Sequence, residues 1–183
     1  MLLNEYQTGA VATAIYPGEL SYPTIGLCGE IGELIEALDE SVDDLTYRQK
    51  AKHYRRIRRE IGDVIWYVAN VANDCGLTLE EVIGSVGFPI SSELWSVDGL
   101  IREFPKATGK VAENVKKAIR DNAGLLTVER RDSVRTALNY VVTLLSRTCN
   151  LYGVTLEECA ILNNVKLNSR KDRGVLKGDG DDR

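Results

Sequence analysis

The sequence of 183 residues is poor in histidine, in aromatic residues and in long apolar runs, and these shortages exclude several classes of protein. Its one histidine, His53, excludes a multi-histidine zinc site, and it excludes a Ser-His-Asp triad unless His53 itself takes part. The longest apolar stretch, residues 64–72, contains Asn70 and is too short to cross a bilayer, and the first residues lack the basic segment of a secretory signal. No membrane partner is therefore expected.

The cysteines and the net charge are informative in the same way. Cys28, Cys75, Cys149 and Cys159 show no C-x-x-C spacing and lie in apolar helical patterns, so they are expected to be small buried side chains in a protein of the reducing cytoplasm. The sequence has 23 Lys and Arg against 27 Asp and Glu, a net charge of −4. It therefore lacks the cationic field of a general polyanion binder, and no stable nucleic-acid partner is expected.

Apolar residues recur at intervals of three and four along most of the chain, which predicts helices. Residues 17–23 contain the turn formers that should separate a short first helix from a second one beginning near Ile25. This second helix holds three glycines, which cost about 1 kcal/mol each relative to alanine. We expect them to permit the close approach of another helix or a ligand. They are Gly26, Gly29 and Gly32.

The clearest apolar stripe covers residues 60–75, and Gly76 is expected to form a left-handed cap after it. Thr78 and Glu81 have the spacing of a capping box, which predicts the start of a short further helix. Pro89 is expected to end this helix. No strand-like alternation competes with the helical pattern.

The second half of the chain repeats features of the first. GLTLEEV at 76–82 reappears as GVTLEEC at 153–159, each time after a long amphipathic segment. The predicted fold is therefore an all-α helical bundle, in which a helical hairpin is duplicated within one domain of residues 1–183. Residues 1–83 form the first half and 84–168 the degenerate second half, and the basic, glycine-containing segment 169–183 is expected to be a loop or a mobile arm.

Two pairs of acids provide the main chemical signal. Glu30 with Glu33, and Glu60 with Asp63, have the i, i+3 spacing that places two carboxylates on one helix face. If the two helices pack side by side, four carboxylates gather at a partly buried interface, where their mutual repulsion requires raised pKa values or bound cations. Hard oxygen ligands favour Mg²⁺ or Mn²⁺, which suit a polyphosphate substrate.

Each acidic pair taken alone is more typical of a solvated helix face than of a site. The position of Glu60 and Asp63 beside the core stripe favours a site, because metal sites of helical bundles are built there. A basic run just before these acids could hold a polyphosphate or a nucleic acid, but a solvated helix face is the preferred interpretation, and His53 within the run is interpreted as a surface residue. The run contains Lys50, Lys52, Arg55, Arg56, Arg58 and Arg59.

The blocks GEIGELIE at 29–36 and EIGDVIWYVA at 60–69 resemble the motif of the MazG-like all-α nucleoside triphosphate pyrophosphohydrolases. The opening NEYQTGAVATAIYP and the closing NNVKLNSRKDRGVLKGDGDDR are similar to the ends of small phage and bacterial members. Each acidic pair is weakly specific, whereas the ordered set of four blocks is strongly specific. The resemblance covers about residues 1–83 and 155–183.

This resemblance implies the hydrolysis of (deoxy)nucleoside triphosphates to the monophosphate and pyrophosphate, with Mg²⁺ held by the four acids. An asparagine and a lysine that the family uses map to Asn163 and Lys166. Arg170 and Arg173 are expected to contact phosphate from the C-terminal arm. Two alternatives stay open: a base-restricted dUTPase or dCTPase type of pyrophosphatase, and a non-catalytic helical module that binds a nucleotide or a partner protein.

The chain departs from the short family pattern at residues 84–154. The repeat places Lys110, Glu113, Ala137 and Tyr140 where the first half has its four acids, so the second half cannot build an equivalent metal site. We interpret it as a degenerate copy that supplies core to the first half. A homodimer is expected from the common family plan, but this duplication within one chain puts the dimer in doubt.

Overall fold

The computed structural model describes residues 1–177, and these form seven α-helices and no strand. This confirms the predicted all-α fold. In chain order the helices are α1 (Leu3–Val11), α2 (Ser21–Asp39), α3 (Tyr47–Asp74), α4 (Leu79–Ile83), α5 (Val97–Asn122), α6 (Val128–Leu151) and α7 (Leu156–Asp172). No helix in this described part is long and apolar enough to traverse a lipid bilayer.

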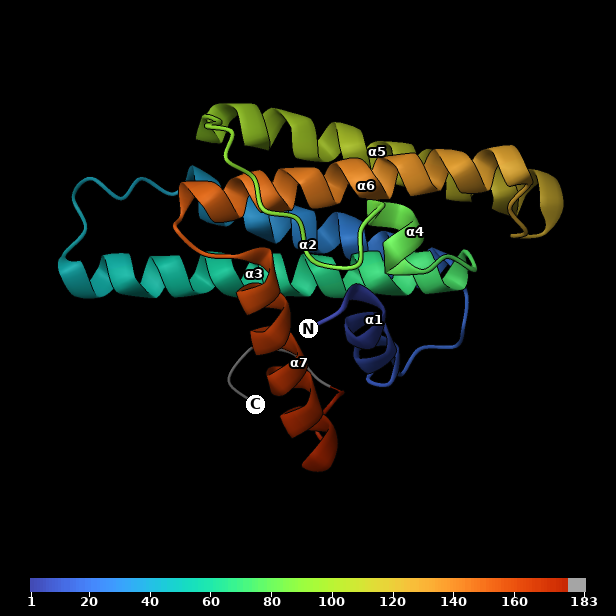
Figure 1. The fold of residues 1–183 in the computed structure, drawn as a ribbon, viewed down its shortest axis with the longest axis horizontal. Helices are drawn as coiled ribbons and strands as arrows, with labels where there is room; N and C mark the ends of the chain where they lie inside the picture. The colour runs from blue at the N-terminus through green and yellow to red at the C-terminus, as the bar shows by residue number, and fades with distance from the viewer. Residues whose placement is uncertain (178–183) are drawn as a thin grey trace.

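The four long helices α2, α3, α5 and α6 run side by side along the long axis of the molecule, and α7 crosses α3 at a steep angle (Figure 1). They form two hairpins, α2 with α3 and α5 with α6. The hairpins meet mainly where α5 packs on α2, whereas α6 makes a smaller contact with α3. One apolar cluster with residues from all seven helices fills the space between them.

Local signals fix most helix boundaries. Gly76 has φ +66° after α3, and Thr78 and Glu81 form the capping box of α4. Two predicted boundaries are wrong. Helix α2 begins at Ser21 rather than near Ile25, because Pro23 fits the first helical turn, where its missing N–H has no partner to lose.

The second wrong boundary is the end of α4, which lies at Ile83 and not at Pro89. Gly84 adopts a left-handed conformation with φ +78°, and its N–H donates to the carbonyl of Glu80. A glycine cap of this kind ends a helix as firmly as a proline does, and it does so five residues earlier here.

The repeated GxTLEE sequences begin α4 and α7, each behind a capping box. Helix α7 is much longer than α4, because it continues through Asp172. The prediction of a loop or arm from Ser169 is therefore wrong for residues 169–172. The remainder of that prediction falls partly on residues 178–183, which lie outside the described residues.

Two predictions about single side chains are also wrong. Cys28 is exposed, since it lies on the outer face of α2, whereas Cys75, Cys149 and Cys159 are buried as predicted. His53 is only 5% exposed. Its Nδ1 lies 3.2 Å from Glu40 Oε2, and its ring lies against the ring of Tyr152 with 6.4 Å between the centroids. The folding of the second hairpin's end over α3 buries this ring.

Candidate active site

Helices α2 and α3 bring three of the four predicted acids together. Glu30 from α2 and Glu60 and Asp63 from α3 each offer one oxygen, and these oxygens lie within 4.8 Å of one another. Glu60 is buried, with 5% of its surface exposed, and the other two are half-buried. We call Glu30, Glu60 and Asp63 the acidic cluster. Glu33, the fourth predicted acid, is exposed and lies outside this group.

A close approach of the two helices positions this cluster. A Cβ atom on Gly26 would lie 2.1 Å from Cε1 of Tyr67, so only glycine lets the Tyr67 ring rest against the α2 backbone. Gly26 precedes Glu30 by one turn, and Tyr67 follows Asp63 by one turn. The expected close approach of another helix is thus confirmed for Gly26. No helix approaches Gly29 or Gly32, where a Cβ would meet nothing within 4 Å.

Helix α7 holds Asp63 from the other side. Asn163 Nδ2 donates to Asp63 Oδ1 over 2.6 Å, and Lys166 Nζ lies 2.7 Å from each of the two carboxylate oxygens. The helices can approach because Gly62 has no side chain: a Cβ there would lie 3.0 Å from the carbonyl oxygen of Cys159. The Asp63 carboxylate is therefore oriented by two residues that lie 100 and 103 positions further along the sequence.

The carboxylates of the cluster repel one another. Burial is the largest cause that raises the pKa of Glu30 to about 8, and the nearby charges of Asp63, Glu33 and Glu60 raise it further, while Lys166 opposes them. Lys166 at Asp63 and Arg56 at Glu60 partly compensate the three carboxylates, which together supply a set of hard oxygen donors. This donor set fits a divalent cation such as Mg²⁺ or Mn²⁺.

The other two predicted substrate contacts lie further along α7. Arg170 follows Asn163 and Lys166 at helical spacing, and its side chain is 6% exposed. Arg173 is the C-terminal cap residue of α7 and is exposed, and its Nε donates to the carbonyl of Ser169 over 3.2 Å. The predicted cations thus follow one another along one helix.

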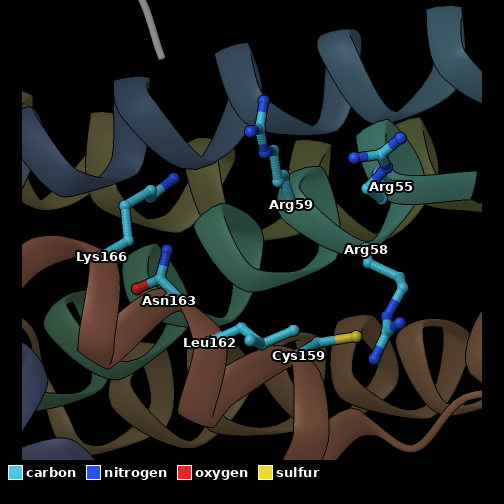
Figure 2. Close-up of a pocket in the computed structure, with 7 residues that line it drawn as sticks. All are labelled: Arg55, Arg58, Arg59, Cys159, Leu162, Asn163 and Lys166. Atoms are coloured by element: carbon cyan, nitrogen blue, oxygen red, sulfur yellow. The ribbon is translucent and has the colours of Figure 1, made fainter. Parts of the chain in front are cut away.

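A pocket of about 350 Å³ opens between α3 and α7 beside the acidic cluster (Figure 2). Its wall is formed by Arg55, Arg58, Arg59, Cys159, Leu162, Asn163 and Lys166. Asn163 is 3% exposed, and within the described residues its Oδ1 accepts no hydrogen bond. The Nδ2 of the same amide is held by Asp63, so the amide presents an unpartnered acceptor beside this pocket.

Sequence reasoning considered a phosphate-binding role for the basic residues of α3 but preferred a solvated face. Arg55, Arg58 and Arg59 were expected on a solvated face, yet all three line this pocket. Their spacing of three and four residues ahead of Glu60 and Asp63 was a usable signal, since it puts cations and acids on neighbouring faces of one helix. The pattern could not show that α7 packs onto α3 and closes the pocket on that side.

Comparisons with known proteins identify the family. Residues 23–87 match the family described as the MazG nucleotide pyrophosphohydrolase domain. The chain is also 40% identical over 85 residues to the Gene 37 protein of Mycobacterium phage L5, an alignment that covers 46% of this chain and 71% of the relative. No solved structure matches the chain. The matched region contains all four predicted acids, and the chain belongs to the MazG nucleotide pyrophosphohydrolase family.

Proposed function

We propose that this protein hydrolyses (deoxy)nucleoside triphosphates to the monophosphate and pyrophosphate in the presence of Mg²⁺. The observation that carries the proposal is the acidic cluster, in which three carboxylates lie within 4.8 Å and one of them is held by Lys166 and Asn163. In the reaction, water attacks the α-phosphorus, the bond from that phosphorus to the bridging oxygen breaks, and pyrophosphate leaves with the bond's electrons.

The residues have distinct roles in this proposal. Glu30, Glu60 and Asp63 hold the cation, and Glu33 adds negative charge from the exposed side of α2. A bound Mg²⁺ would neutralise phosphate charge and acidify the attacking water. One carboxylate acts as the general base.

The cations of α7 act on the substrate side. Lys166 neutralises Asp63 directly at 2.7 Å and can share its three N–H donors with a phosphate oxygen. Arg170 and Arg173 continue this row along α7 and are proposed to contact the phosphates. Asn163 fixes the orientation of Asp63 through its Nδ2 and offers its Oδ1 to a donor.

A turnover panel tests this function. Each of the common ribo- and deoxyribonucleoside triphosphates is incubated with the protein and Mg²⁺, and the products are separated. We expect monophosphate and pyrophosphate, and no activity in the Glu60→Gln variant. Diphosphate and phosphate would contradict the proposed bond cleavage. Turnover restricted to the nucleotides of a single base would indicate the dUTPase or dCTPase type. Nucleotide binding without any product would indicate a non-catalytic module.

A further inference from the structure

A groove of about 840 Å³ adjoins the acidic cluster along the N-terminal half of α3. It is larger than the pocket between α3 and α7, and Glu60 belongs both to this groove and to the acidic cluster. Five of its lining residues are cationic. The full lining comprises Glu33, Arg48, Gln49, Lys52, Arg55, Arg56, Arg59 and Glu60. We call this the cationic groove.

Helical spacing explains how one segment builds this groove. Arg48, Lys52, Arg55 and Arg59 follow one another at intervals of four, three and four residues, so they share one face of α3. At a rise of 1.5 Å per residue, Arg48 and Arg59 lie about 16 Å apart along the helix axis. Asp63 comes one turn after Arg59, so the row of cations leads directly to the acidic cluster.

The charge in the groove is unevenly compensated. Arg56 faces acids, with nitrogen atoms 3.6 Å from Glu36 and Glu40 and 3.8 Å from Glu60. In the described part of the chain, by contrast, Arg48, Lys52 and Arg55 form no ion pair with a carboxylate. The start of α3 lies among them, and its helix dipole adds positive potential.

We propose that the cationic groove binds the phosphate chain of the nucleotide beyond the bond that is hydrolysed, and so selects nucleotides with three or more phosphates. The direction in which the phosphate chain lies in the groove rests on the proposed function, because pyrophosphate is the group that leaves. Two phosphates lie beyond that bond in a triphosphate and three in a tetraphosphate. A cationic row of about 16 Å has room for either.

A nucleic-acid strand fits the groove less well than a short polyphosphate. The groove has Glu33 and Glu60 in its wall at the end near the acidic cluster, and the protein carries a net charge of −4. A strand that continued past the groove would therefore meet negative surface. A short, highly charged chain that ends at the cluster with a divalent cation avoids this repulsion.

Binding of inorganic anions tests the groove without using activity. Phosphate, pyrophosphate and tripolyphosphate are titrated by calorimetry into the full chain in EDTA, at one ionic strength. We expect affinity to rise with chain length. The Arg48→Gln, Lys52→Gln double variant should bind tripolyphosphate at least tenfold more weakly. Lys50→Gln, which removes a cation of the same helix outside the groove, should stay within twofold of the unaltered protein.

Equal affinity for the three anions, or an equal loss in Lys50→Gln, would overturn the proposal, since either result means unspecific attraction. Comparable binding of a short single-stranded DNA that loses affinity in the double variant would also overturn it in favour of a nucleic-acid groove. Circular dichroism and thermal melting check that each variant is folded. If the double variant is unfolded, Arg48→Gln and Lys52→Gln are measured singly under the same criteria.

Kinetics separate this inference from the proposed function. We expect the double variant to raise KM for a triphosphate at least tenfold, and the unaltered protein to hydrolyse a nucleoside 5′-tetraphosphate with a similar kcat/KM. Turnover that is normal in the double variant would refute the groove and leave the function intact. Absence of turnover with chain-length-dependent binding of tripolyphosphate would refute the function and leave the groove intact.

Discussion

At the scale of single residues, Gly26 decides whether the acids of α2 and α3 can meet. The Tyr67 ring occupies the space where any other residue would carry its Cβ, 2.1 Å from the nearest ring atom. The ring is half-buried and lies edge-to-face against Trp66, with 4.8 Å between the ring centroids. A side chain at position 26 therefore displaces this ring or pushes the two helices apart beside the acidic cluster.

We predict that Gly26→Ala destabilises the protein by about 1–3 kcal/mol, the usual cost of overpacking, and weakens Mg²⁺ binding. Gly29→Ala is the matched control, because a Cβ there meets nothing within 4 Å. It should stabilise the helix by up to about 1 kcal/mol. Urea unfolding of both variants and magnesium titration measure these effects. Equal stability of the two variants would contradict the close approach.

Asp63 and Glu33 are expected to differ in their effect on stability. Relief of repulsion alone would make either loss neutral or stabilising. Asp63→Ala, however, also removes the acceptor of Asn163 and Lys166. We predict that it costs about 1–3 kcal/mol in EDTA, whereas Glu33→Gln on the exposed surface costs almost nothing. Both variants should lose most turnover. Chemical denaturation together with the pyrophosphate assay checks this, and equal stability would show that α7 does not depend on Asp63.

The raised pKa of Glu30 predicts how the stability of the metal-free protein changes with pH. Its pKa is about 8 in the folded protein against an ordinary value of 4.5, so between these values the folded state binds more protons. The stabilisation is fully present below about pH 4.5 and is lost as the pH rises through 8. In EDTA the free energy of unfolding should therefore fall between pH 6 and 8.5, and less steeply in Glu30→Gln. Identical slopes in the two proteins would assign the titration to another group.

At the scale of secondary-structure elements, α7 is the element that completes the site. Its capping box repeats that of α4, but its sequence then continues as a helix for 17 residues, against five in α4. This length carries Asn163 and Lys166 onto α3. The second hairpin keeps only Glu113 of the four acids, because Lys110, Ala137 and Tyr140 stand at the other three corresponding positions. Tyr140 donates its hydroxyl to Glu103 over 3.0 Å.

Gly62→Ala tests the contact between α3 and α7. Its Cβ would lie 3.0 Å from the backbone carbonyl of Cys159, which cannot move without the helix. We predict a loss of about 1–3 kcal/mol in stability and a large loss of turnover. The control is Gly9→Ala, whose Cβ lies 3.0 Å from the side-chain amide of Asn164, a group that can rotate. Full activity of Gly62→Ala would contradict the role of α7.

At the scale of the whole molecule, the two hairpins share one core. Helix α5 covers α2, and buried residues of α6 belong to the same apolar cluster as those of α3. The second hairpin thus supplies to the first, within one chain, an apolar partner of the kind that a second subunit could supply. The covering of α2 by α5 does not require a dimer.

Leu145→Asp tests this shared core. Leu145 on α6 is fully buried, so the variant places an unpaired charge in the apolar cluster and should destabilise the whole protein by several kcal/mol. It should also abolish turnover, although Leu145 lies on the hairpin without the acids. Leu94→Asp, at a residue 88% exposed, should change neither property. Loss of the second hairpin's structure alone, with activity kept, would show two independent units.

The sequence by itself determined the features that depend on neighbouring residues. Helical periodicity, the capping box at Thr78 and the left-handed glycine at position 76 are local, so their pattern predicted the helices. The pairing of Glu60 with Asp63 on one helix face has the same origin. Family resemblance added Asn163 and Lys166, for which helical periodicity alone gives no reason.

Only the tertiary structure decided which of these residues meet. Glu33 shares a helix with Glu30 yet lies outside the acidic cluster, His53 is buried by a distant hairpin, and the basic run of α3 lines a groove. Each of these outcomes depends on the angle and distance at which helices cross. Contacts between residues far apart in sequence set that geometry, such as Gly26 with Tyr67 and Gly62 with Cys159. The spacing of residues along one helix carries no information about what packs against it.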